Sequence, residues 1–155
     1  MIVASVLTDN GADDAGLGPV LLEQIGAAIA SVTADGAYDG EPVYQAVASR
    51  QPDPPAAVVI PPRVSAVLGT NAADAPSQRG QHIRRIAARG RMGWQKATGY
   101  GRRNLAETAI GRYKSLIGPR LRARTFSTQQ GEAAIAVEAL NRMIRVAKPI
   151  SSRAA

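Results

Sequence analysis

The sequence has 155 residues, 45% of them hydrophobic and 20% charged, a composition typical of a folded globular domain rather than of a disordered chain. It contains no cysteine and one histidine, which excludes disulfides, zinc-thiolate and iron–sulfur sites, thiol catalysis and metal sites built from several histidines. It has no apolar run of about 18 residues and no secretory signal, so we expect a soluble, cytoplasmic protein.

The net charge of +7 conceals two halves of opposite sign. Residues 1–75 hold nine acidic and two basic side chains, whereas residues 76–155 hold three acidic and 17 basic ones. Fourteen of these 17 cations are arginines, whose planar guanidinium groups suit bidentate contacts with phosphate. A folded domain with one strongly basic half is typical of a nucleic-acid-binding protein; the alternatives are a solvated basic surface and an acidic protein partner.

The first half of the chain alternates strand and helix patterns. Residues 2–8, 29–34 and 56–60 are rich in β-branched and apolar side chains and predict three strands. Helices are predicted over residues 20–25, entered at Asp14 or Pro19, and over residues 42–49. Strands joined by short helices need crossover connections, so we expect an α/β domain with a mixed, at least partly parallel sheet.

The second half of the chain is predicted to be helical. After a loop over residues 63–80, helices are expected over residues 81–91, 104–117 and 128–147, with Gly99 separating the first two. We expect one domain over residues 1–155, with an acidic α/β part over 1–75 and a basic helical part over 76–155.

The stretch of residues 99–114 carries a stripe of polar side chains. On an ideal helix Tyr100, Arg103, Glu107 and Lys114 fall within about 60° of one another. Glu107 is the sole carboxylate of this stretch and is surrounded by cations. A carboxylate repels phosphate, so its position suggests that it holds a divalent cation that phosphate shares. The alternative is a helical Arg103–Glu107 ion pair worth about 0.3–0.5 kcal/mol.

Asp35 is a second candidate metal ligand because it directly follows the predicted strand 29–34. In open α/β sheets, ligands bind beyond the carboxyl ends of the strands. The alternative is that Asp35-Gly36 and Asp39-Gly40 are simply turns.

Tyr100, Arg103, Glu107 and Lys114 reproduce the spacing Y-x2-R-x3-E-x6-K. This pattern resembles the signature of the DDE transposases of bacterial insertion sequences, of the IS-four and IS-five kind. Residues 35–39, 90–96, 118–124 and 140–143 resemble further segments of that family, so the resemblance covers nearly the whole chain.

The resemblance implies a ribonuclease-H-like fold in which two Asp and one Glu hold two Mg²⁺ ions for phosphoryl transfer, namely DNA strand cleavage and strand transfer. By position, Asp35 would be the second catalytic, metal-binding carboxylate and Glu107 the third. Transposon-end and target DNA are the implied partners, with a second copy of the chain or an N-terminal fragment of the same transposase. The expected DNA-binding residues are Tyr100, Arg102, Arg103, Arg112 and Lys114.

The first catalytic Asp of the family lies on a strand upstream of the segment that resembles residues 1–8. We therefore expect an N-terminally truncated fold with C-terminal helices, an incomplete Mg²⁺ site, and a chain that is inactive by itself. The alternative is a non-catalytic DNA-binding remnant or a complementing fragment of a split transposase.

Overall fold

The computed structural model describes residues 1–9, 11–51, 53–69 and 77–147 and divides into two compact units. The α/β unit comprises residues 10–104, and the helical unit comprises residues 1–9 and 105–155. Within the described part of the chain, none of the helices combines the length and the apolar character that a membrane span requires. The junction at residue 75 between the predicted acidic and basic parts lies outside the described residues.

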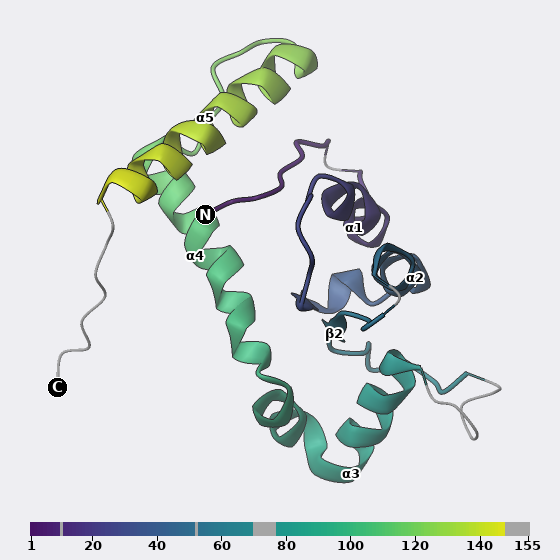
Figure 1. Cartoon of the computed structure of the whole chain (residues 1–155). Helices are drawn as coiled ribbons and strands as arrows, with labels where there is room; N and C mark the ends of the chain where they lie inside the picture. The colour runs from purple at the N-terminus through teal and green to yellow at the C-terminus, as the bar shows by residue number, and fades with distance from the viewer. Residues whose placement is uncertain (10, 52, 70–76, 148–155) are drawn as a thin grey trace, which may run out of the picture. The chain divides into compact units, whose positions relative to one another are not determined.

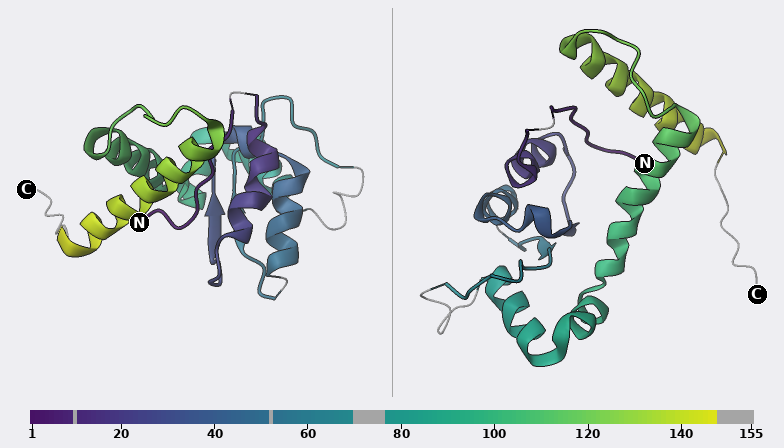
Figure 2. Two further views of the ribbon diagram at one scale, coloured as in Figure 1. Left: turned by 90° about the horizontal axis from the view of Figure 1, so that it is seen from above. Right: turned by 180° about the vertical axis from the view of Figure 1, so that it is seen from behind.

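The α/β unit is built on two short parallel strands joined through a helical crossover (Figure 1). Val32 lies opposite Val58 in the register. Helices α1 and α2 lie side by side, as both views of Figure 2 show. In chain order the elements are α1 (Asp14–Glu23), β1 (Ser31–Thr33), the 3-10 helix η1 (Gly36–Tyr38), α2 (Glu41–Arg50), β2 (Ala57–Val59), α3 (Gln78–Thr98) and the 3-10 helix η2 (Tyr100–Arg103).

Apolar side chains of α1, α2 and the β2 segment form the core of this unit, and Ile60, Val58 and Val43 are among its most deeply buried members. Asp13 caps the start of α1 by accepting a hydrogen bond from the Gly16 N–H at 2.9 Å. The strands predicted over residues 29–34 and 56–60 are confirmed, each in shorter form.

The prediction of a mixed sheet with a strand over residues 2–8 is wrong: the described sheet consists of β1 and β2 alone and is parallel. A strand needs a backbone partner, and residues 2–8 belong to the helical unit, where a side chain takes that role. The Asn141 amide accepts from the Ile2 N–H at 2.9 Å and donates to the Ile2 carbonyl at 2.7 Å. Both backbone groups of Ile2 are thereby satisfied without a neighbouring strand.

The edge of β2 that faces away from β1 is covered by side chains of α3. Gln78 donates to the Ala56 carbonyl at 3.0 Å and accepts from the Val58 N–H at 2.8 Å. His82 Nε2 lies 2.6 Å from the Val58 carbonyl oxygen. An unpaired edge exposes backbone donors and acceptors to other chains, and these two side chains occupy them instead. They also fix the first half of α3 against the sheet.

Helix α3 is interrupted at Gly90 and ends at Gly99. Gly90 has φ 68° and ψ 168°, and Gly99, the C-cap, has φ 68° and ψ 26°. Glycine adopts these positive φ values without the steric cost that a Cβ atom brings. The helix predicted over residues 81–91 is therefore confirmed at its core but continues past a kink to Thr98.

Asp39 is fully buried and neutralised by an arginine 40 positions away. Its side chain is 0% exposed and accepts from Arg79 Nε at 2.8 Å and Arg79 Nη2 at 2.9 Å. The Arg63 N–H adds a third hydrogen bond at 3.0 Å. Burial by itself would raise the pKa of Asp39, but the bonds from Arg79 and Arg63 outweigh it and lower this pKa below its usual value.

The helical unit contains α4 (Asn104–Leu116) and α5 (Phe126–Ala147), which confirm the helices predicted over residues 104–117 and 128–147. Leu140 of α5 is completely buried. Thr125 marks the start of α5, since its carbonyl accepts from the Gln129 N–H at 2.9 Å and its hydroxyl lies 2.7 Å from that of Thr128.

We predict that Asp39→Ala lowers the free energy of unfolding of the α/β unit by roughly 3–5 kcal/mol, because Arg79 loses the buried carboxylate that compensates it. The measurement is urea unfolding followed by the fluorescence of Trp94, the single tryptophan. Glu23→Ala removes an exposed carboxylate from the end of α1 and should leave the transition within about 0.5 kcal/mol. Equal transitions for both variants would contradict the prediction.

Candidate functional site

Asp35 stands at the carboxyl end of β1, as the sequence predicts. The ladder continues one step beyond the strand through the Ala34 N–H, which donates to the Val59 carbonyl at 3.3 Å. Asp35 Oδ1 then accepts from the Ala37 N–H at 3.0 Å and caps η1. The turn interpretation of Asp35 is thus correct for one carboxylate oxygen.

The second oxygen of Asp35 faces a residue of the predicted signature. Arg103 Nη2 lies 3.8 Å from Asp35 Oδ2, and the two side chains are 32% and 43% exposed. They come from η2 and from the end of β1, 68 positions apart in sequence. The α/β unit therefore brings together one predicted metal ligand and one predicted phosphate-binding guanidinium at a surface that solvent reaches.

Tyr100 is positioned by an aromatic chain that begins at the sheet. Trp94 is 0% exposed, and its ring centroid lies 5.2 Å from that of Tyr100 and 5.5 Å from that of His82. Trp94 Nε1 donates to His82 Nδ1 at 2.9 Å, so His82 Nε2 carries the proton and donates to the Val58 carbonyl. Trp94 is therefore a packing anchor between His82 and Tyr100.

Sequence reasoning missed the roles of His82, Asp39 and Arg79. His82 lies in the first half of α3 and is buried against β2. Asp39 was expected to serve only a turn, yet it is the centre of the ion pair with Arg79. Both partnerships span long stretches of sequence, and the one available signal was the presence of unusual polar residues beside apolar segments.

The polar stripe does not lie on a single α-helix. Tyr100, Arg102 and Arg103 belong to the 3-10 helix η2, and α4 begins only at Asn104, so the ideal-wheel angles do not hold across the junction. This part of the prediction is wrong because Gly99 and the Trp94–Tyr100 contact impose a tighter turn. Within α4, Glu107 and Lys114 are seven positions apart and share a face.

Arg112 lies on the other face of α4. It lines a hollow of about 240 Å³ within the helical unit, together with apolar side chains of the N-terminal segment and of α5. Glu107 and Lys114 do not line this hollow. The full lining is Met1, Ile2, Leu105, Thr108, Ala109, Arg112, Leu140 and Ile144.

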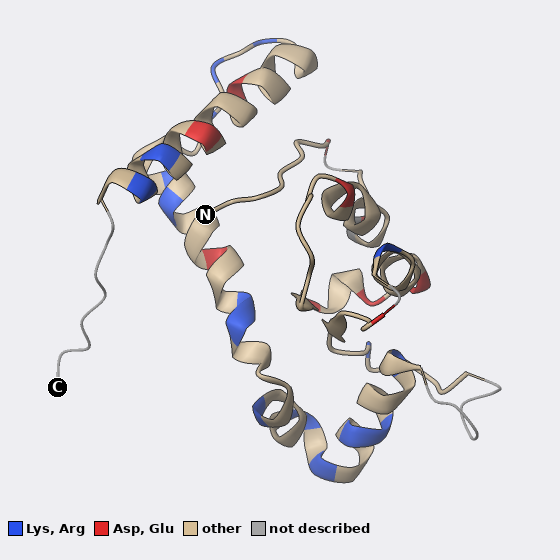
Figure 3. Ribbon diagram, viewed as in Figure 1, with Lys and Arg blue, Asp and Glu red and all other residues tan. Residues whose placement is uncertain are grey.

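Basic side chains gather on α3 in the α/β unit (Figure 3). Arg84, Arg85 and Arg89 line an open hollow of about 520 Å³ with Ala88, Trp94 and Ala97. An arginine-rich wall of this kind suits a phosphate ligand.

A divalent cation fits Asp35 as one ligand among several. The carboxylate is a hard oxygen donor, it is 43% exposed, and its orientation is set by the Ala37 N–H. No three His, Cys, Asp or Glu side chains gather at one place among the residues that the structure describes. Glu107 lies in the helical unit and Asp35 in the α/β unit.

We predict that acid weakens the α/β unit through His82. Burial lowers the pKa of His82 below its usual value, and the nearby Arg85 acts in the same direction, against the Val58 hydrogen bond and Asp39. The neutral ring is thus favoured in the folded state. The contribution of His82 to the free energy of unfolding is complete above about pH 6.5 and is lost progressively as the pH falls below that value. The fluorescence of Trp94 in urea titrations measures this loss. His82→Gln, which keeps a donor and an acceptor but does not titrate, should remove the dependence between pH 5 and 7; an equal dependence in this variant would contradict it.

A comparison with family models matches residues 1–142 to the transposase DDE domain. No solved structure matches the chain. Transposases of this family generally use divalent metal ions, and membership implies a ribonuclease-H-like fold and DNA as a partner. Since the match spans almost the whole sequence, the chain belongs to the DDE transposase family.

Proposed function

We propose that the protein acts in DNA transposition by two-metal phosphoryl transfer, with Asp35 and Glu107 as metal ligands and Mg²⁺ as the ion. The observation that carries the proposal is the Asp35–Arg103 pair at the carboxyl end of β1. It joins a carboxylate suited to a hard cation with a guanidinium suited to a phosphate, at the sheet edge where α/β folds bind ligands.

Each signature residue has a distinct task in this proposal. Arg103 would bind a non-bridging phosphate oxygen and stabilise the charge that develops during the transfer. Tyr100, held by Trp94, would direct its hydroxyl to a neighbouring phosphate of the transposon end, and Lys114 would add a point charge from α4. The Mg²⁺ ions, when bound, would activate the attacking water or 3′-hydroxyl and stabilise the leaving oxygen. Arg102 and Arg112 would contribute further phosphate contacts.

The proposed site residues belong to both units. Asp35, Tyr100 and Arg103 belong to the α/β unit, and Glu107 and Lys114 belong to the helical unit.

We predict that Asp35→Asn and Glu107→Gln each weaken Mn²⁺ binding at least about tenfold, because each removes a negatively charged oxygen ligand. Mn²⁺ serves as a paramagnetic substitute for Mg²⁺, and electron paramagnetic resonance titration measures the free ion. Glu41→Gln, an exposed carboxylate on α2, is the matched control and should bind Mn²⁺ like the unaltered chain. Unchanged binding in both site variants would overturn the proposed metal site.

We predict that a polypeptide of these 155 residues binds DNA but does not nick it in Mg²⁺ or Mn²⁺. Two-metal chemistry of this family uses three carboxylates, and two are assigned here. Supercoiled plasmid, separated on agarose after incubation with each ion, provides the measurement. Nicking that disappears in Glu107→Gln would show that these residues alone complete the site.

A further inference from the structure

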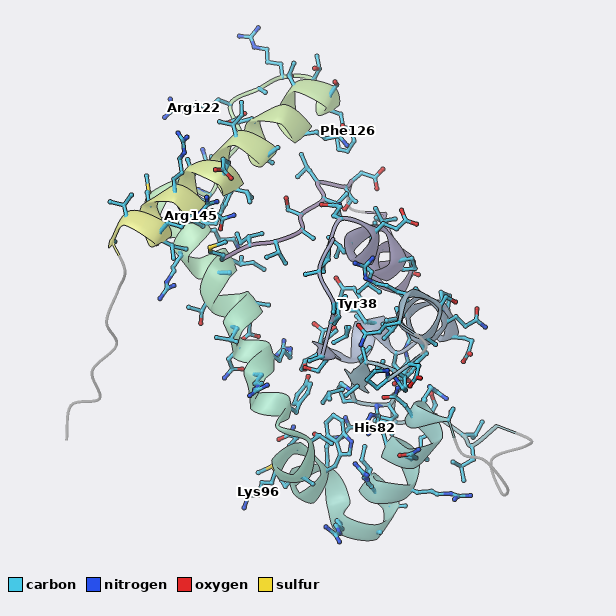
Figure 4. All side chains as sticks on the ribbon, viewed as in Figure 1. Tyr38, His82, Lys96, Arg122, Phe126 and Arg145 are labelled. Carbon is cyan, nitrogen blue, oxygen red and sulfur yellow. The ribbon has the colours of Figure 1, made fainter. Side chains whose placement is uncertain are left out.

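The loop of residues 117–125 between α4 and α5, here called the arginine loop, carries arginines at alternate positions. Arg120, Arg122 and Arg124 are exposed, whereas Leu121 and Ala123 between them are half-buried. The three arginines therefore face solvent, whereas the residues between them are partly covered. Figure 3 shows the basic residues of this loop, and Figure 4 labels Arg122.

A carboxylate of α5 holds the backbone of the arginine loop. Glu132 Oε2 accepts from the Arg122 N–H at 2.9 Å and from the Ala123 N–H at 2.8 Å, and Oε1 also lies 2.9 Å from the Arg122 nitrogen. Gln129, one turn earlier, donates to the Ala123 carbonyl at 3.0 Å. Two side chains of one helix therefore bind three polar groups of the loop backbone.

The use of Glu132 is unusual for an acid among arginines. Its oxygens point to backbone N–H groups, and the bonds from Ala123 and then Arg122 lower the pKa of Glu132 below its usual value. Glu138, two turns further along α5, pairs with arginine side chains instead of backbone N–H groups. It lies 3.9 Å from Arg142 Nε and 3.6 Å from Arg145 Nη2, so it partly neutralises two cations.

We propose that the arginine loop binds the phosphate backbone of DNA through Arg120, Arg122 and Arg124, and that Glu132 is the positioning residue that holds the loop in its binding conformation. Three exposed arginines lie within five successive residues of this loop. Guanidinium groups bind phosphates through two hydrogen bonds each, so a loop with three of them suits the phosphate backbone of DNA. This inference rests on the proposed function, because it takes DNA as the partner.

Substitutions of Glu132 distinguish a positioning role in DNA binding from the effect of its negative charge. The loss of a negative charge strengthens non-specific DNA binding, since phosphate is repelled less. If Glu132 positions the loop, Glu132→Ala will instead weaken binding to a 30-base-pair duplex, by roughly three- to tenfold, measured by fluorescence anisotropy. Glu132→Gln loses the same charge but keeps an acceptor oxygen for the loop N–H groups, and should restore the affinity.

Glu138→Ala is the matched control on the same helix. It removes the same charge and releases Arg142 and Arg145, so the duplex should bind equally well or more tightly. Circular dichroism establishes that all variants are folded. Equal or tighter binding by Glu132→Ala, as in Glu138→Ala, overturns the positioning role of Glu132.

The salt dependence of binding tests the arginines themselves. Replacing Arg120, Arg122 and Arg124 together by Gln should reduce the slope of log K against log salt by about 2.7, since each phosphate contact contributes about 0.9. The matching replacement by Lys keeps the charges and should keep the slope. An unchanged slope in the Gln variant, with duplex binding retained, overturns the arginine loop alone. The proposed function has a separate readout, the loss of Mn²⁺ binding in Asp35→Asn and Glu107→Gln.

Discussion

The outer edge of β2 is the constraint on which the α/β unit depends. Backbone groups at Ala56 and Val58 would have no partner on that side of the two-stranded sheet, and α3 supplies Gln78 and His82 to satisfy them. Because His82 binds Trp94 through its other nitrogen, the same contact sets the second half of α3, and Trp94 in turn packs on Tyr100. The contacts that satisfy the edge of β2 therefore also set the position of Tyr100, the first residue of the transposase signature.

Asp35, which follows β1, and Asp39, at the end of η1, have different environments, and these assign them different uses. Asp39 is enclosed and satisfied by Arg79 and the Arg63 N–H, so it holds the loops together and has no coordination position for a ligand. Asp35 caps η1 with one oxygen and meets Arg103 only at 3.8 Å with the other, at a partly exposed surface. The fold thus keeps one acid as a structural anchor and leaves the other accessible to a cation.

Local patterns in the sequence predicted the helices and the two paired strands, because side-chain periodicity and glycine positions act over a few residues. They failed where the outcome depended on distant partners. Residues 2–8 have strand composition, but Asn141 satisfies the Ile2 backbone in place of a neighbouring strand. Asp35 was predicted from its position after a strand, and Arg103 from the polar stripe and the family signature, whereas the Asp39–Arg79 pair has no local signal. The tight turn at Tyr100 needed knowledge of the Trp94 contact.

Gly90 divides α3 into a segment that is bound to the sheet and a segment that carries the aromatic anchor. A residue with a Cβ atom disfavours φ 68°, so the kink favours glycine at this position. The bend also lets the first segment face β2 with His82 while the second brings Arg91 Nη2 to the Pro62 carbonyl at 3.1 Å. The direction of the chain that leads to Tyr100 therefore depends on the backbone conformation of one glycine.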